Sequence, residues 1–213
     1  DWTNIKSIAD NYVSWIDSKN IEEISEKDAN NYITAEKHIS SDLFSFVKFT
    51  NSKKEIIIPI GSYITKNHLF SNKLLNYSHS NNCIQKSEFN IPNMLEHAHK
   101  LLETPYLWGG KTPMGMDCSG FTQVLYRFAG FQLPRDASQQ AKIGYEVSLD
   151  CSQMGDLAFF EENSKINHVG ILISNDKIIH CSGKVRIDKI DTKGIYNESI
   201  KKYTHSLKTI KRL

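Results

Sequence analysis

Apolar and polar residues follow different patterns before and after residue 90 of this 213-residue chain. In the first part, short apolar stretches rich in β-branched and aromatic residues are separated by polar residues. Such stretches predict β-strands joined by turns, here strands at residues 12–16, 43–49, 55–60 and 62–64 and a turn at 51–54. The first part is therefore expected to contain a small β-barrel, with residues 80–93 as the linker to the second part.

The pattern after residue 117 predicts an amphipathic helix. Its apolar positions recur at helical spacing and are Phe121, Val124, Leu125, Phe128 and Ala129, after which Gly130 marks a helix end. Four glycines surround Cys118, with Gly109, Gly110 and Gly115 before it and Gly120 two residues after it, and they favour close backbone approach. Cys118 is thus expected in the first turn of a helix that follows a glycine-rich loop.

Two further apolar stretches, residues 167–174 and 177–181, predict a β-hairpin around Asn175 and Asp176. His168 opens the first strand and His180 lies near the end of the second. A strict two-residue turn pairs His180 with Ile171 and places His168 on the opposite face of the sheet. A three-residue turn or a bulge places both histidines on the same face, and the sequence leaves this choice open.

These residues together have the chemistry of a cysteine hydrolase. A thiol in the first helical turn lies near unpaired N–H groups and the positive end of the helix dipole, so the pKa of Cys118 is expected to fall towards neutrality. His168 would serve as the base and His180 as the residue that orients it. The alternative for Cys118 is a buried structural cysteine, which the surrounding glycines disfavour.

The remaining histidines are expected to have surface or packing roles: His38, His68, His79, His97, His99 and His205. The four cysteines form no CxxC pair, so a disulfide framework is not expected. A zinc site built from Cys118, Cys181 and the two histidines has suitable ligand types but lacks the usual ligand spacing. No metal or other cofactor is therefore expected.

Six blocks in the same order resemble the NlpC family of bacterial cell-wall peptidases, which are papain-like cysteine enzymes; the blocks are residues 105–110, 117–121, 134–136, 155–157, 167–170 and 179–180. Within it the chain looks like the branch that cuts between γ-D-glutamyl and an L-diamino acid and carries SH3-like domains. The resemblance implies an α+β fold with a papain-like catalytic domain at 91–213. Before it would lie an SH3-like β-barrel and linker at 29–90 and a partial or short SH3-like segment at 1–28.

The same resemblance assigns catalytic roles. Cys118 would attack the γ-D-glutamyl carbonyl, and His168 would act first as base and then as acid for the leaving amine, with His180 orienting it. The backbone N–H of Cys118 and the hydroxyl of Tyr106 would face the oxyanion, a type of donor typically worth roughly 10²–10³ in rate. For Tyr106 and Trp108 the alternative is core packing.

Substrate contacts are also implied by the resemblance. Asp117 and Ser119 would contact the peptide, and Arg135 with Asp136 would anchor the free α-amine of an N-terminal L-Ala. Relatives have a serine directly after this aspartate, whereas here the serine is Ser138, one place later. Tyr12 of the N-terminal part would help to bind the same amine. As alternatives, Asp136 is also a plain helix N-cap with Gln139 three residues on, and Tyr12 is a core residue of a strand.

The expected partners are muropeptides derived from peptidoglycan, handled by a monomer in cell-wall turnover or recycling. A net charge of +2 without a dense basic run argues against nucleic acid, and no apolar stretch approaches the roughly 18 residues of a membrane span. The cell envelope or periplasm is the expected location, for a secreted protein or a lipoprotein, with the cytoplasm as the alternative. Alternative functions are a silent wall-binding scaffold, a muramoyl-L-alanine amidase and a lipid acyl transferase.

Overall fold

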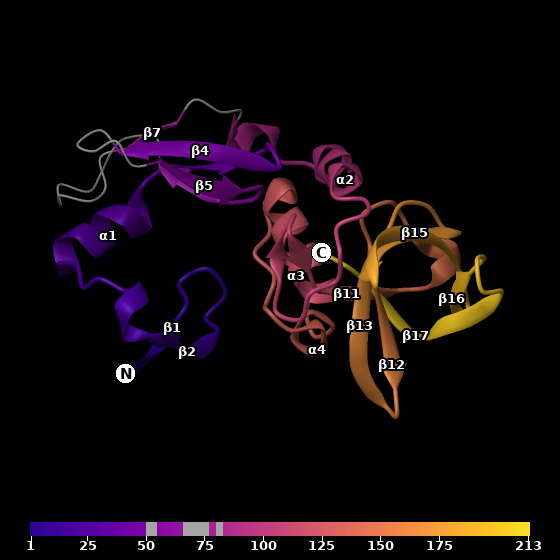
Figure 1. Cartoon of the computed structure of the whole chain (residues 1–213). Coiled ribbons are helices and arrows are strands. Elements are labelled where there is room, and N and C mark those ends of the chain that lie inside the picture. Colours follow the sequence, from indigo (N-terminus) through magenta and orange to yellow (C-terminus); the bar gives the residue numbers. More distant parts are fainter. Residues whose placement is uncertain (50–54, 66–76, 80–82) are drawn as a thin grey trace. The chain divides into compact units, whose positions relative to one another are not determined.

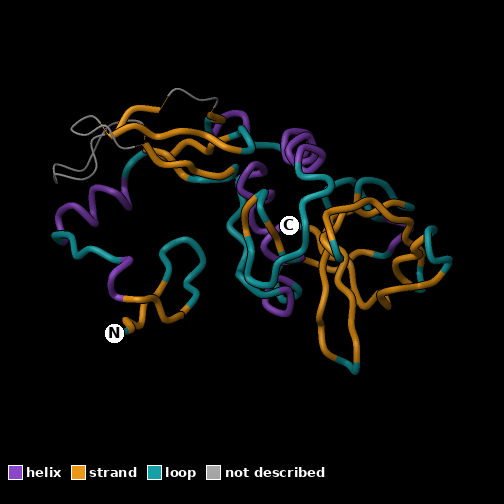
Figure 2. Tube along the Cα trace, in the orientation of Figure 1, coloured by secondary structure: helices purple, strands orange, loops and turns teal. Residues whose placement is uncertain are grey.

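The computed structural model describes residues 1–49, 55–65, 77–79 and 83–213. The chain divides into two compact units, Asp1–Phe89 and Asn90–Leu213. Figure 1 shows the helices and strands of each unit in sequence colours, and Figure 2 shows that strands predominate in both. In the described residues, no helix is both long and apolar enough to span a membrane.

The N-terminal unit begins with an antiparallel hairpin of β1 (Trp2–Lys6) and β2 (Val13–Asp17). The helix α1 (Glu26–Thr34) follows, and the hydroxyl of Ser25 caps it by accepting the N–H of Asp28 at 3.1 Å. Tyr12 lies in the connection that precedes β2 and is 40% exposed, so the alternative of a core tyrosine within a strand is wrong.

Two three-stranded antiparallel sheets complete this unit. One has the order β6-β3-β8 and the other β5-β4-β7. Their strands are β3 (Lys37–Ser40), β4 (Phe44–Phe49), β5 (Glu55–Pro59), β6 (Tyr63–Thr65), β7 (Tyr77–His79) and β8 (Cys83–Ile84). The four predicted strands are confirmed as β2, β4, β5 and β6, while the predicted turn at 51–54 lies outside the described residues. The SH3-like identity of this unit stays a prediction.

The expected linker is largely ordered where the structure describes it. Residues 83–93 contain β8, a 3-10 helix (Lys86–Glu88) and the start of α2 (Ile91–Lys100). Pro92 occupies the first turn of α2, where backbone N–H groups make no hydrogen bond within the helix, so a residue without an N–H is tolerated. Asn90 caps the helix by accepting the N–H of Asn93 at 2.8 Å. The proline therefore marks a helix start.

The C-terminal unit is built on a closed β-barrel. The strands pair in the order β12-β13-β14-β15-β16-β17, and β17 pairs back with β12, while β11 adds to β17. All of these pairings are antiparallel, and the strands are β11 (Tyr145–Val147), β12 (Leu157–Glu162), β13 (Lys165–Leu172), β14 (Lys177–Ser182), β15 (Lys184–Asp191), β16 (Gly194–Asn197) and β17 (Lys202–Arg212). Closure leaves the six strands without a free edge.

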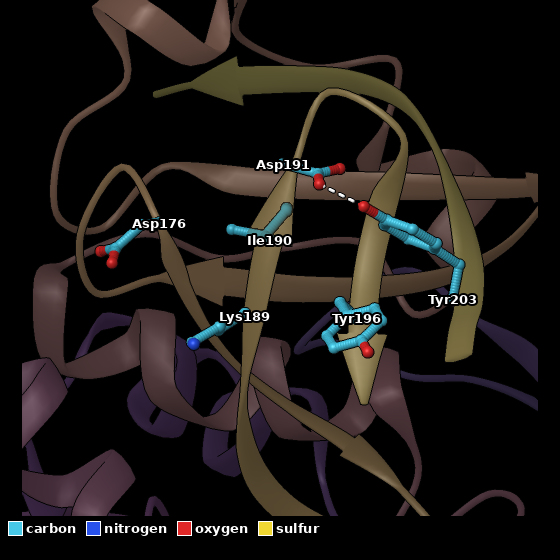
Figure 3. Close-up of a pocket in the computed structure, with 6 residues that line it drawn as sticks. All are labelled: Asp176, Lys189, Ile190, Asp191, Tyr196 and Tyr203. Carbon is cyan, nitrogen blue, oxygen red and sulfur yellow. Dashed lines mark hydrogen bonds between the residues drawn. The ribbon is translucent and has the colours of Figure 1, made fainter. Parts of the chain in front are cut away.

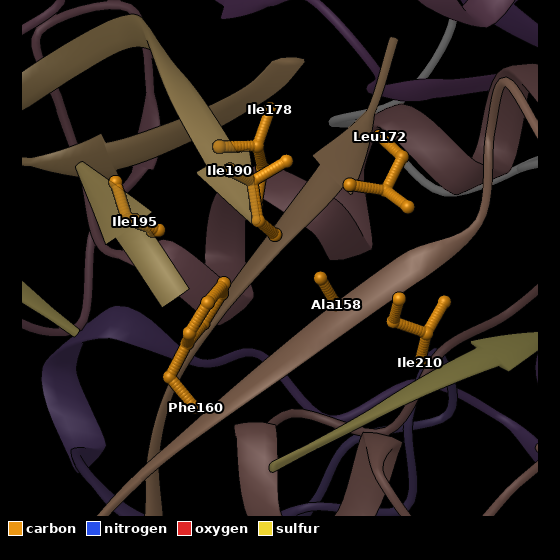
Figure 4. Close-up of a cluster of buried hydrophobic side chains, with 7 residues drawn as sticks. All are labelled: Ala158, Phe160, Leu172, Ile178, Ile190, Ile195 and Ile210. Carbon is orange, nitrogen blue, oxygen red and sulfur yellow. The ribbon is translucent and has the colours of Figure 1, made fainter. Parts of the chain in front are cut away.

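The barrel has a hydrophobic core, shown in Figure 4, made of Ala158, Phe160, Leu172, Ile178, Ile190, Ile195 and Ile210. Burying each of the larger side chains stabilises the fold by roughly 1.5–3 kcal/mol. Since alternate residues of a strand share a face, His168 shares the face of Leu172 on β13, and His180 shares that of Ile178 on β14. The two histidines therefore continue the inward face of the barrel.

The predicted helix is α3 (Cys118–Tyr126), which continues as a 3-10 turn to Gly130, whose φ of 86° only glycine adopts readily. It packs against β13 and β14. All nine of its residues are buried, so the polar face of this amphipathic helix is covered as well as the apolar one. Its polar side chains find internal partners: Thr122 donates to Gln140 at 2.8 Å, and Gln123 donates to the carbonyl of Leu133 at 2.9 Å.

Candidate active site

Cys118 is the first residue of α3 and lies where β13 and β14 separate. The β13–β14 pairing ends at Gly170 and His180, although both strands continue beyond that pair. The N–H groups of Val169, next to His168, of Ser119 and of Cys118 itself favour the thiolate of Cys118, which places the sulfur beside them. The thiol thus lies beside β13 just beyond its last pair with β14.

The expected fall in the pKa of Cys118 is wrong. Only 7% of the residue is exposed, and burial raises the pKa of the thiol above its usual value of 9.0, against the effect of the three N–H donors. The neighbouring carboxylate of Asp117 raises it further. A helix N-terminus identified in sequence gives no measure of this desolvation, which depends on tertiary packing. The resting site therefore holds a neutral thiol.

Alkylation by iodoacetamide is expected to be slow at Cys118 near pH 7 and to accelerate about tenfold for each pH unit up to pH 9, because only the thiolate reacts. Peptide mapping by mass spectrometry at several pH values measures this rate. The exposed Cys151 provides the internal control in the same sample. A rate at Cys118 that stays constant between pH 6 and pH 8 would show a thiolate already formed and contradict this expectation.

His168 and His180 are hydrogen bonded, with His168 Nε2 and His180 Nδ1 2.9 Å apart. Leu172 pairs with Ile178 and Gly170 with His180, so the turn spans the three residues 174–176. The three-residue alternative is therefore correct, and His180 lies diagonally across from His168 on the same face. His180 faces Gly170, and the absence of a side chain there leaves the space through which it reaches His168.

Replacing Gly170 by alanine is expected to destabilise the fold by about 1–3 kcal/mol and to slow hydrolysis. The added Cβ would lie 2.8 Å from the Cβ of His180 and 2.7 Å from Cδ1 of Ile178, so His180 must move. Thermal unfolding and steady-state kinetics measure the two effects. The matched control is Gly183→Ala, whose Cβ meets open space and whose cost is limited to its positive φ; equal kinetics for the two variants would refute the role of Gly170.

His205 belongs to the same cluster, although its polar sequence context predicts a surface position. Its ring on β17 stacks on that of His168, with centroids 4.1 Å apart and planes 27° apart. Burial lowers the pKa of His205 to about 4, and it lowers the pKa of His168 well below 6.5, with further contributions from His180 and His205. The expected surface role is therefore wrong. The alternation of His205, Leu207 and Thr209 along β17 is the signal that could have identified it.

Asp188 on β15 was also missed. Its carboxylate Oδ2 lies 3.0 Å from His180 Nε2, and its Oδ1 accepts a hydrogen bond from Arg186 Nη2 at 2.8 Å. Burial favours the neutral form, but the hydrogen bonds from His180 and Arg186 outweigh it and hold the pKa of Asp188 below its usual value. A hydrogen-bonded series thus runs from His168 through His180 to an ionised carboxylate.

Asp117, Ser119 and Arg135 form a buried network beside Cys118. Asp117 caps α3 by accepting the N–H of Gly120 at 2.6 Å, and it accepts the N–H of Gly109 at 2.8 Å. Arg135 donates to both carboxylate oxygens of Asp117 and to the hydroxyl of Ser119. The side chains predicted to contact the peptide thus also fix the loop that presents Cys118.

Tyr106 and Trp108 differ in exposure. Tyr106 is 36% exposed, and its pKa is raised first by burial and then by the Cys118 and Asp117 charges, which places its ring near the nucleophile. Trp108 is 86% exposed, so the core-packing alternative is wrong for it.

The residues predicted to hold the substrate amine lie in separate units. Asp136 is half-buried and is the N-cap of α4 (Ala137–Gln140), where Gln139 accepts its N–H at 3.2 Å, so the helix-cap interpretation is confirmed. Ser138 is exposed in the first turn of α4. Tyr12 belongs to the N-terminal unit, and its role toward the amine stays a prediction.

A surface cavity of about 260 Å³, shown in Figure 3, is lined by residues of β15, β16 and β17 together with Asp176. Its lining includes neither Cys118 nor any of the three histidines. Across the described ranges, no group of three histidine, cysteine, aspartate or glutamate side chains is arranged to hold a metal ion. The zinc alternative therefore finds no support there.

Residues 103–206 match the NlpC/P60 family. The gamma-D-glutamyl-L-lysine dipeptidyl-peptidase of Bacillus subtilis (strain 168) is 45% identical over 82 residues, which cover 37% of this chain and 28% of that protein. The protein of the same name from Bacillus cereus is 32% identical over 124 residues, which cover 53% of this chain and 37% of that protein. The probable endopeptidase NlpC of Escherichia coli is 42% identical over 96 residues, which cover 44% of this chain and 62% of that protein. The matched segments thus span less than two thirds of these relatives.

The fold has a counterpart among solved structures. The crystal structure of an NlpC/P60 family protein from Bacillus cereus superposes with a TM-score of 0.74, covering 99% of this chain and 78% of that chain at 18% identity. At this identity the likeness concerns the fold alone. Residues 103–206 are thus similar in sequence to the NlpC/P60 family, and the fold of the chain is similar to that of a solved protein of this family.

Proposed function

We propose that this protein is a cysteine peptidase that hydrolyses the bond between γ-D-glutamyl and an L-diamino acid in peptidoglycan stem peptides with a free N-terminal L-Ala. The observation that carries the proposal is the position of the Cys118 thiol at the N-terminus of α3, beside the N–H that follows His168, together with the hydrogen bond between His168 and His180. The two relatives named gamma-D-glutamyl-L-lysine dipeptidyl-peptidase support this bond as the target.

The reaction follows from the protonation states. The thiol and His168 are both neutral at rest, because burial raises the pKa of Cys118 and lowers that of His168. As the sulfur attacks the γ-carbonyl carbon, its proton passes to the imidazole, and the C–N bond then breaks as the imidazolium protonates the leaving amine. Water hydrolyses the thioester with His168 again as base. The N–H of Cys118 and the Tyr106 hydroxyl would stabilise the oxyanion.

Binding of the substrate would use charges near the nucleophile. Asp136, with Arg135 beside it in the sequence, is proposed to hold the α-amine of L-Ala, assisted by Ser138. Asp117 and Ser119 would line the peptide path. A requirement for this free amine would restrict the enzyme to peptides already released from glycan, and this fits a role in cell-wall turnover or recycling at the cell envelope.

The test is incubation of the purified protein with L-Ala-γ-D-Glu-L-Lys and with L-Ala-γ-D-Glu-meso-diaminopimelate, followed by mass spectrometry. Release of L-Ala-γ-D-Glu is expected, and N-acetylation of the L-Ala is expected to suppress it. No release from either peptide would refute the assignment and favour a silent scaffold. Release of intact peptide from muramoyl-L-Ala-γ-D-Glu-L-Lys would instead indicate the amidase.

A further inference from the structure

Asp188 occupies a position from which it can control the catalytic histidines. His180 pairs with Arg186 and Ile178 with Asp188 across β14 and β15, so Asp188 lies diagonally across from His180 on the same face. Asp188 is 8% exposed and His180 is 1% exposed, so water does not compete for their contact. The distances are 3.0 Å from Asp188 Oδ2 to His180 Nε2 and 2.9 Å from His180 Nδ1 to His168 Nε2.

The ionised carboxylate of Asp188 determines the direction of both hydrogen bonds, the one from His180 to Asp188 and the one between His168 and His180. An ionised carboxylate only accepts, so His180 Nε2 must carry a proton and donate it to Asp188. A neutral imidazole has one N–H, which leaves His180 Nδ1 as an acceptor. His168 must then donate from Nε2, and its Nδ1 is left with a free lone pair. One buried carboxylate thereby selects one tautomer at each of two histidines.

We propose that Asp188 is a positioning residue that fixes the tautomers of His180 and His168, so that Nδ1 of His168 is free to accept the proton of Cys118. This inference deepens the proposed function, on which its catalytic part rests. Without the carboxylate, His180 could carry its ring proton on Nδ1 and accept a hydrogen bond at Nε2. His168 would then have to accept at Nε2 and hold its proton on Nδ1, the atom that must act as base.

The surrounding charges support these protonation states. Arg186 pairs with Asp188 and, with His180, keeps the pKa of that carboxyl low despite burial. Burial lowers the pKa of His180, although Asp188 opposes the shift, so the ring is neutral at pH 7. His205 faces both rings from β17, and burial keeps it neutral as well. Arg186 and Asp188 are thus the charged pair at this end of the cluster.

The tautomers can be measured without substrate. In the ¹⁵N-histidine-labelled protein at pH 7.5, long-range ¹H–¹⁵N correlation spectra are expected to show both His168 and His180 protonated on Nε2 and unprotonated on Nδ1. Histidine-to-glutamine variants assign the signals. Protonation of His168 on Nδ1, or of His180 on Nδ1, in the native protein would overturn the proposal. This spectrum is informative even if a variant fails to fold.

The variant test compares Asp188→Asn with Asp191→Asn, a control on the same strand. An amide can donate as well as accept, so Asp188→Asn is expected to give mixed tautomers at His180 and to lower kcat about 10- to 100-fold with KM unchanged, as when a residue supporting a ligand or base is lost. Asp191→Asn should keep the native tautomers and kcat. Native tautomers and kcat in Asp188→Asn would overturn the proposal. If the native protein cleaves neither peptide, the proposed function fails, while the tautomer result stands.

Discussion

Replacing Cys118 by alanine is expected to reduce kcat for γ-D-glutamyl hydrolysis by about 10⁴-fold or more, with the fold retained. Removing the nucleophile or its base from a hydrolase lowers kcat by this factor or more, because both groups act in one proton-coupled step. The same reasoning predicts that adding His168→Ala to Cys118→Ala lowers the rate no further. Single-turnover assays with L-Ala-γ-D-Glu-L-Lys, read by mass spectrometry, provide the measurement.

The matched control is Cys151→Ala, which removes an exposed cysteine of the same unit and should leave kcat unchanged. Circular dichroism of each variant establishes that the fold persists. Additive losses for Cys118→Ala and His168→Ala would mean that the two side chains act independently, and the reaction scheme would then be wrong. A native kcat in Cys118→Ala would show that Cys118 is not the nucleophile.

Replacing Arg135 by alanine is expected to lower the free energy of unfolding by about 3–5 kcal/mol, the usual cost of breaking a buried ion pair by removing one partner. Arg135 and Asp117 are 11% and 8% exposed at their side chains. Although burial alone would raise the pKa of Asp117, the hydrogen bonds from Arg135 and Gly120 hold it below its usual value. The variant would leave this carboxylate charged, buried and short of two donors.

Urea unfolding at pH 7 measures this loss, and Arg135→Lys, which keeps the charge but not the two-pronged contact, should give a smaller one. Because the pKa of Asp117 is lowered by folding, its stabilising contribution is present above the unfolded value of about 3.9 and is lost as pH falls through the folded value. The difference between wild type and Arg135→Ala should therefore shrink near pH 3. A difference below 1 kcal/mol at pH 7 would show that the pair is dispensable.

The elements that could be predicted from sequence are those with local signals. Strands at 43–49 and 55–60, the helix after Asp117 and the hairpin that carries His168 and His180 follow from periodicity and turn residues, and the structure confirms each. The hairpin register remained open because a shift of one residue changes the face of every side chain. Only the observed pair of Gly170 and His180 decides it.

The parts that could not be predicted depend on contacts between distant strands. His205 reaches His168 because β17 pairs with β12, which also pairs with β13. The alternation of residues 205–209 indicates a half-buried strand, but it does not identify the strands beside it. Asp188 alternates with exposed residues on β15 and looks like an ordinary polar position until the register with β14 is known. The raised pKa of Cys118 reflects burial by the assembled unit, which no motif encodes.

The closed ring of strands has a consequence for how the protein inactivates. No strand of the ring can detach without breaking hydrogen bonds to two neighbours, so partial fraying inside it is costly and the ring should open as one cooperative unit. The imidazoles on β13, β14 and β17 then keep their mutual geometry until that unit melts. On heating, catalytic power and secondary structure should disappear at the same temperature, with no inactive but folded intermediate preceding the collapse.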